Sequence, residues 1–198
     1  MTKIIEYEEV QLNDPEVYRF SKEEYLELYR SGFFPMNLRT ELIYGQIIRK
    51  MAKGELHSGL IGLIMAYLYK SYPNDEFTFR GESPVDLPDT SIPEPDLSIC
   101  EYRQDGYTKA HPTEKQVLLI IEVANSSLGY DRNRKLELYA KAGIPEYWIV
   151  NLVNDRIELH DTPDPENGTY THSRIINRGK TIQSNLLGAH PAHRFLAP

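Results

Sequence analysis

The segment from Val117 to Asn151 constrains the fold most, because its pattern predicts a buried strand, a helix and a second buried strand. The run Val117–Val123 is almost entirely apolar and rich in β-branched residues, which is typical of a strand covered on both faces. A polar turn and an amphipathic helix over about residues 131–142 follow, with Asp131 as the expected N-cap. The strand Glu146–Asn151 is apolar again. A parallel pair joined by the helix is therefore expected.

Glu122 is the one charged residue in the first of these strands. A carboxylate is costly to bury in an apolar strand unless a cation or hydrogen-bond donor accompanies it. Glu122 therefore needs either a partner or a metal, and it is the first candidate for a functional residue.

Composition indicates an ordinary globular protein. Of 198 residues, 40% are hydrophobic and 26% are charged, and we expect one domain over residues 1–198 because no linker or repeat interrupts the chain. No apolar run approaches the ~20 residues of a membrane span, and the first residues lack the apolar core of a signal peptide, so a cytoplasmic protein without membrane contact is expected. A single cysteine excludes a disulfide framework and a cysteine-rich zinc site. The net charge of −7 argues against strong non-specific binding of nucleic acid but allows a local basic groove.

The remaining patterns predict further elements around this unit. Ser21 begins a helix with Glu24 completing a capping box, and Leu42–Arg49 predicts two strands joined by a tight turn at Tyr44-Gly45. The clearest long helix, Glu55–Ser71, has apolar residues on more than one side and is expected to pack on two sides. The other expected elements are an irregular arm over residues 1–20 with a short strand at Ile4–Val10, a strand at Phe77–Arg80 that continues through Pro84–Leu87, a short strand at Leu97–Cys100, an antiparallel pair at Arg156–His160 and Tyr170–Arg174, and a poorly patterned tail (181–198) over the body.

Three residues form a pattern with chemical meaning: Asp96 before one strand, Glu122 on the next, and Lys135 on the following helix. Two neighbouring carboxylates make an oxygen site of the kind that Mg²⁺ prefers, with water and substrate phosphate as its other ligands. A lysine beside them can stabilise negative charge that grows on phosphorus. The alternative is structural, with Asp96 capping a turn, Glu122 paired with Arg134, and Lys135 in solvent.

Several stretches together resemble the Uma2 family of restriction-endonuclease-like proteins. The stretches are ELIYGQII (41–48), His57 at the start of the long helix, PEPDLSI (93–99), LLIIEVANSS (118–127) and, most specifically, DRNRKLELYAKAGIPEYWIVN (131–151). They occur in the order of the family and cover about residues 20–160, which is the expected core of the domain.

This resemblance implies the PD-(D/E)xK nuclease fold, an α/β architecture with a central mixed β-sheet flanked by helices. It implies Mg²⁺ or Mn²⁺ held by Asp96 and Glu122, with Pro95-Asp96 as the PD pair. The usual lysine two residues after the second acid would fall at Ala124, and the family's lysine on the next helix corresponds to Lys135. Glu41 corresponds to an additional family acid, so the resemblance implies a catalytic role for it as a further metal or water ligand.

The sequence therefore predicts a metal-dependent endonuclease that acts on nucleic acid, with DNA expected first. The main alternative is a nucleic-acid-binding or oligomerisation module on the same fold, whose acids have no catalytic role. A third possibility is a metal-dependent hydrolase of small phosphate esters. Nearby basic residues such as Arg132, Arg134 and Lys141 could contact phosphates but not read bases. His57 could contact substrate, although packing is the commoner role of such a residue, as it is for Tyr139.

The Tyr147-Trp148 pair and a total of 14 tyrosines are more aromatic residues than a small core needs. We therefore expect a two-fold homodimer, which light scattering can distinguish from a single chain.

Overall fold

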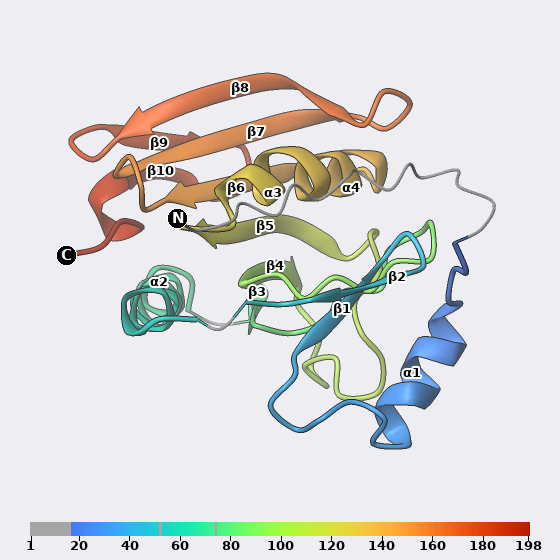
Figure 1. The fold of residues 1–198 in the computed structure, drawn as a ribbon. Helices are drawn as coiled ribbons and strands as arrows, with labels where there is room; N and C mark the ends of the chain where they lie inside the picture. Colours follow the sequence, from blue (N-terminus) through green and yellow to red (C-terminus); the bar gives the residue numbers. More distant parts are fainter. Residues whose placement is uncertain (1–16, 52, 74) are drawn as a thin grey trace, which may run out of the picture.

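The computed structural model describes residues 17–51, 53–73 and 75–198, and Figure 1 shows helices packed against a twisted sheet. The short strand predicted at Ile4–Val10 lies outside these residues. In chain order the elements are α1 (Lys22–Arg30), β1 (Thr40–Ile43), β2 (Gln46–Arg49), α2 (Glu55–Ser71), β3 (Phe77–Gly81), β4 (Leu97–Glu101), β5 (Val117–Ala124), α3 (Leu128–Tyr130), the π-helical segment η1 (Asp131–Lys135), α4 (Leu136–Lys141), β6 (Glu146–Asn151), β7 (Arg156–Asp164), β8 (Thr169–Asn177), β9 (Thr181–Ser184), β10 (Gly188–Pro191) and the 3₁₀ turn η2 (Ala192–Arg194).

The main sheet has six strands in the order β3-β4-β5-β6-β7-β8. Strands β5 and β6 are parallel, as the strand–helix–strand pattern predicts, and the other neighbouring pairs are antiparallel. The predicted central mixed sheet flanked by helices is thus confirmed. The β1–β2 and β9–β10 hairpins are separate two-stranded sheets.

Alternation along β5 decides where Glu122 points. Leu119, Ile121 and Val123 belong to the core cluster that contains the buried residues of α2. Ile120 and Ala124 belong to the cluster that contains the buried residues of α4. Because side chains alternate between the faces of a strand, Glu122 shares the second face and points toward the helical segment that carries Lys135.

The short local predictions at the start of the chain are confirmed. Ser21 and Glu24 form both hydrogen bonds of a capping box at the start of α1. Strands β1 and β2 pair antiparallel around a turn at Tyr44 and Gly45, which have φ of +51° and +73°. Two consecutive positive φ angles are the signature of a tight hairpin turn whose twist matches that of its strands.

The helix after β5 differs from the prediction at its start. It begins at Leu128, not at Asp131, and continues through the π-helical segment η1 into α4. Asp131 is therefore not an N-cap but an internal residue, buried beside the end of β5. A π turn inserts one extra residue into a helix, which shifts every later side chain around the axis; such turns are frequent at functional sites.

Two further predictions are wrong in detail. Helix α2 buries Leu60, Ile61, Ile64 and Leu68, but Leu56 and Leu63 are more than half exposed, so it packs on one side only. Strand β3 ends at Gly81, because the next segment turns away at Glu82 and forms only isolated bridges near Leu87.

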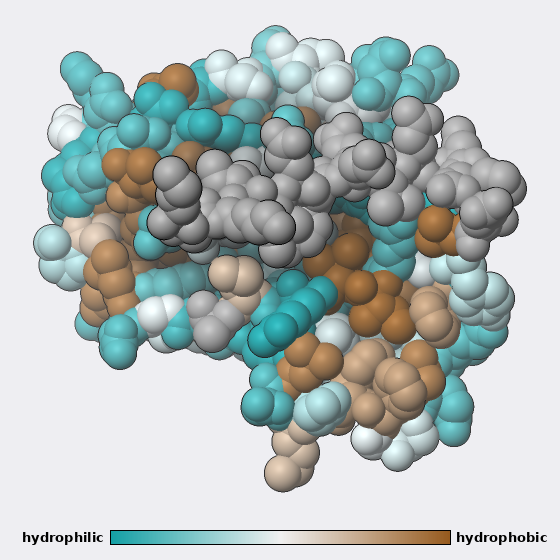
Figure 2. All heavy atoms as spheres, viewed as in Figure 1, coloured by the Kyte–Doolittle hydropathy of each residue, from teal (hydrophilic) through white to brown (hydrophobic). Residues whose placement is uncertain are grey.

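The tail lies over the body and completes the core. Phe195 is fully buried, and its ring contacts Trp148 with centroids 5.2 Å apart. Tyr147 and Trp148 are themselves fully buried, so this pair gives no support to the predicted homodimer. On the face shown in Figure 2, apolar residues gather over the α1 and β1–β2 region instead.

No helix in the described part of the chain is both long and apolar enough to cross a membrane.

Candidate active site

The four residues that sequence analysis singled out line one cleft. It has a volume of about 440 Å³ and lies between the β1–β2 hairpin, the start of α2, the facing ends of β4 and β5, and η1. Its charged lining residues are Glu41, Arg49, Lys50, Lys53, Asp96, Glu122, Asp131 and Lys135, with His57 beside them. Residues that are far apart in sequence thus converge on one solvent-reachable hollow, as the nuclease prediction requires.

Asp96 and Glu122 lie side by side where β4 begins and antiparallel β5 ends. The Asp96 backbone N–H donates to Glu122 Oε2 at 3.2 Å, and the Val123 N–H donates to Asp96 Oδ2 at 2.8 Å. Each carboxylate is therefore held by the backbone next to the other. Both side chains are buried, so their orientation is set by the sheet itself.

Lys135 connects two of the acids. Its Nζ donates to Glu41 Oε2 at 2.8 Å and to Glu122 Oε1 at 3.2 Å. The Tyr139 hydroxyl, one turn later, donates to the same Glu122 oxygen at 2.8 Å. Lys135 is only 3% exposed and Arg134 bonds Gln46 instead of Glu122, so the structural alternative for this lysine and this acid is wrong.

The other side of Asp96 is occupied by residues that precede and open α2. Lys53 Nζ lies 2.6 Å from Asp96 Oδ1, and His57 Nε2 lies 2.9 Å from Asp96 Oδ2. Lys53 Nζ also lies 2.6 Å from Glu82 Oε1, on the segment that follows β3. His57 is thus a site residue and not a plain packing residue, and Lys53 and Glu82 join the site.

Burial and neighbouring charges in the cleft shift the pKa values of its acids and of Lys135. Burial raises the pKa of Asp96, and the neighbouring Glu122 carboxylate raises it further. Burial alone would raise the pKa of Glu122, but the Lys135 and Lys50 ammonium groups bring it below its usual value. Burial alone would lower the pKa of Lys135, but Glu122 and Glu41 bring it well above its usual value. Glu122 and Lys135 are therefore a charged pair at neutral pH.

Asp131 is a further acid in the cleft that the helix prediction placed elsewhere. Burial raises its pKa from the usual value to about 7, and the charge of Glu122 adds to the shift. Asp131 therefore holds a proton in the folded protein at pH values where the unfolded chain has lost it.

We expect Asp131→Asn to remove a pH dependence of stability. An acid whose pKa is raised by folding stabilises the native state below its unfolded pKa, and this contribution is lost as the pH rises through its folded pKa. Between pH 5 and pH 8 the wild type should lose about 2–3 kcal/mol of unfolding free energy relative to the variant. Urea unfolding at both pH values measures this difference. An equal difference between the two proteins at pH 5 and pH 8 would contradict it, and Asp155→Asn, in an exposed pair with Arg178, is the control.

The oxygen donors fit a hard divalent cation with few protein ligands. Asp96 and Glu122 supply neighbouring carboxylates, and both face a cleft that solvent reaches. Within residues 17–51, 53–73 and 75–198, no three His, Cys, Asp or Glu side chains are arranged to enclose a metal. This arrangement suits Mg²⁺ or Mn²⁺, which commonly take one or two carboxylates and complete their shell with water and phosphate.

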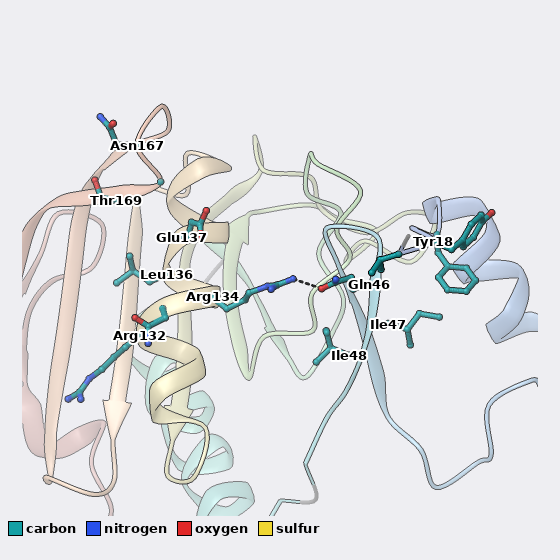
Figure 3. A pocket seen from close by; sticks show the side chains of 14 residues that line it. Tyr18, Gln46, Ile47, Ile48, Arg132, Arg134, Leu136, Glu137, Asn167 and Thr169 are labelled. Carbon is teal, nitrogen blue, oxygen red and sulfur yellow. Dashed lines mark hydrogen bonds between the residues drawn. The ribbon is translucent and has the colours of Figure 1, made fainter. Parts of the chain in front are cut away.

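A larger hollow of about 1070 Å³ lies beside the cleft, and Ile48 lines both (Figure 3). None of the four predicted site residues lines it. In Figure 3, Arg134 points across this hollow to Gln46, and its Nη2 lies 2.7 Å from Gln46 Oε1. Arg132 points away and forms two hydrogen bonds with Glu158, while Lys141 pairs with Glu137. The basic residues expected to contact phosphates are thus engaged within the chain.

Sequence reasoning did not identify Lys53, Glu82 or Asp131. The first two lie in segments without a periodic pattern, where nothing in the sequence indicates which way a side chain points. Asp131 could have been identified, because it lies four residues before Lys135 and so on the same side of a helix. It was interpreted as an N-cap instead.

Comparisons with known proteins identify a family and a fold. The family model of Uma2, described as putative restriction endonuclease, matches residues 22–190. Among curated proteins, no relative of the sequence is found. A similar solved structure is that of a putative nuclease belonging to DUF820 from Anabaena variabilis, which shares 14% sequence identity with a TM-score of 0.64, over 89% of this chain and 97% of that chain. At this identity the likeness establishes the fold alone.

Proposed function

Because the chain belongs to the Uma2 family of putative restriction endonucleases, we propose that it is a metal-dependent nuclease that hydrolyses phosphodiester bonds in nucleic acid, with DNA as the first expected substrate. The observation that carries this proposal is the convergence of Glu41, Asp96, Glu122 and Lys135 in one cleft. Four ionisable groups gathered in a solvent-reachable hollow have no evident structural purpose. This favours a catalytic site over a binding module with relic acids.

In this proposal Asp96 and Glu122 would hold Mg²⁺ or Mn²⁺. The bound metal supplies Lewis-acid activation of water and offsets charge on the phosphate. The hydrogen bonds that Asp96 accepts from the Val123 N–H and Glu122 from the Asp96 N–H keep both carboxylates in place without a metal.

Lys135 stabilises the negative charge that develops on the phosphoryl group, because its ammonium group is held beside Glu122 and the side chain is buried. Glu41 and Tyr139 orient the lysine, and neither needs to contact the substrate to do so. Glu41 is therefore a positioning residue, in addition to its place among the family acids.

The experiment that tests the proposal is metal-dependent cleavage. Protein treated with EDTA should not cleave a panel of single- and double-stranded DNA and RNA, and addition of Mg²⁺ or Mn²⁺ should start cleavage. Asp96→Asn should lower the rate at least about a hundredfold, since the amide cannot provide the charge that a hard cation requires. Asp155→Asn, which alters only the exposed pair with Arg178, should cleave like the wild type.

The panel also separates the alternatives. Retention of nucleic acid without cleavage in either metal would favour the binding module. Hydrolysis of p-nitrophenyl phosphate without cleavage of any polynucleotide would favour a hydrolase of small phosphate esters. The homodimer and the cytoplasmic location stay predictions.

A further inference from the structure

Lys53 lies beside Asp96, one of the two carboxylates that would hold the metal. Its ammonium group lies 2.6 Å from Asp96 Oδ1, and the other Asp96 oxygen is engaged by His57 and the Val123 N–H. Both oxygens of this proposed metal ligand thus already have partners. Lys53 is the partner of Oδ1, the oxygen that keeps a free lone pair, so a divalent cation that binds there would be repelled by the ammonium group.

Lys53, unlike Lys135, has a carboxylate partner at the rim of the cleft as well as one inside it. Lys135 is bonded to Glu41, Glu122 and Tyr139, all of them deep in the site. Lys53 is shared between Asp96 and Glu82, and the Glu82 side chain is 39% exposed at the rim. A shift of Lys53 toward Glu82 keeps its charge paired and leaves Asp96 free on one side.

The contacts of Glu82 fix its position beside Lys53. Its backbone N–H donates to the Asp96 carbonyl oxygen at 3.0 Å, so the two acids are tied together through the main chain. Glu82 has a φ of +46°, which residues with a side chain seldom adopt, so its surroundings dictate its position. Arg39 also binds it, with Nη1 2.8 Å from Glu82 Oε1. Although burial raises the pKa of Glu82, the Lys53 and Arg39 hydrogen bonds bring it to about 2, so it is charged at neutral pH.

Charge repulsion favours the same movement. The ammonium groups of Lys50, Lys53 and Lys135 already face the three carboxylates of Glu41, Asp96 and Glu122 in the cleft. A divalent cation on Asp96 would add two positive charges beside Lys53, and a shift of Lys53 toward Glu82 would separate these like charges.

We propose that Lys53 is the resident counter-ion of Asp96, which competes with the metal for this carboxylate and is drawn to Glu82 when the metal binds. This assignment rests on the proposed metal-dependent function and makes Lys53 a positioning residue for the site. Beside Glu82 the ammonium group remains in the lining of the cleft, where it can offset the charge of an incoming phosphate.

The test is the affinity for Mn²⁺ alone, measured by electron paramagnetic resonance of free Mn²⁺ and by calorimetry, without any nucleic acid. Lys53→Met removes the competing charge and should tighten Mn²⁺ binding about tenfold, since unit charges a few ångströms apart interact by more than one kcal/mol in a partly buried site. Glu82→Gln removes the second partner of Lys53 and should weaken Mn²⁺ binding. A purely structural role would not give opposite signs for the two variants.

Lys22→Met is the matched control, because Lys22 pairs with Asp86 outside the cleft at 2.5 Å. It should bind Mn²⁺ like the wild type. Wild-type binding of Mn²⁺ with no tightening in Lys53→Met, or a loss of affinity in that variant, would overturn the role of Lys53 and leave the nuclease proposal standing. Should Lys53→Met fail to fold, unchanged or tighter binding in Glu82→Gln would overturn it equally. No Mn²⁺ binding by the wild type would overturn both proposals.

Discussion

Glu122→Gln is expected to reduce Mg²⁺-dependent cleavage about a thousandfold while the protein stays folded. A metal in a hydrolytic site contributes several kcal/mol to transition-state stabilisation, and each 1.4 kcal/mol changes the rate about tenfold. Glutamine keeps the volume of the side chain, and its one amide oxygen can still accept from either Tyr139 or the Asp96 N–H, which donate to different oxygens of Glu122. It lacks the charge that holds the cation.

Stability should change little, because Lys135 keeps Glu41 as a charged partner in this variant. Cleavage rates at saturating Mg²⁺ and urea unfolding, measured on the same preparation, separate the two effects. Glu158→Gln is the matched control, since Glu158 is also buried and paired, with Arg132, but lies on β7 outside the cleft. It should lose stability and keep activity. A Glu122→Gln protein that cleaves as fast as the wild type would place the reaction elsewhere.

Lys135→Met should have the largest effect on stability and a large effect on rate. Removal of the ammonium group leaves Glu41 and Glu122 buried without their shared cation, and breaking a buried ion pair from one side typically costs about 3–5 kcal/mol. Loss of one preorganised positive charge should lower the cleavage rate a further hundred- to thousandfold, by analogy with about 3–4 kcal/mol for one such donor. Urea unfolding and single-turnover cleavage measure the two quantities.

The cause of the instability can be isolated with a second variant. Glu41→Gln added to Lys135→Met removes one unpaired carboxylate and should restore part of the lost stability, with no recovery of cleavage. If the double variant is less stable than Lys135→Met, the cost arises from lost packing of the lysine chain. Lys22→Met, in a pair open to solvent, should change stability by less than about 1 kcal/mol.

The sequence pattern was sufficient to predict those elements whose structure depends only on residues close together in the chain. The apolar runs of β5 and β6, the capping box at Ser21 and the tight turn at Tyr44-Gly45 were all predictable, because each depends on residues within a few positions. The alternation along β5 also meant that Glu122 had to share a face with Ile120 and Ala124. From the residues alone, Asp96, Glu122 and Lys135 followed; Glu41 followed only from the family resemblance.

The sequence by itself therefore determined the strand–helix–strand unit and the acids at its edge, since periodicity reports which face of an element a residue occupies. Only the tertiary structure decided which groups meet there. Lys135 reaches Glu41 across 94 residues of chain, and Lys53 reaches Asp96 across 43. The π turn that places Asp131 in the cleft, and the left-handed backbone of Glu82, are conformations that local preference disfavours. Such conformations persist because surrounding contacts hold them, and those contacts come from segments distant in sequence.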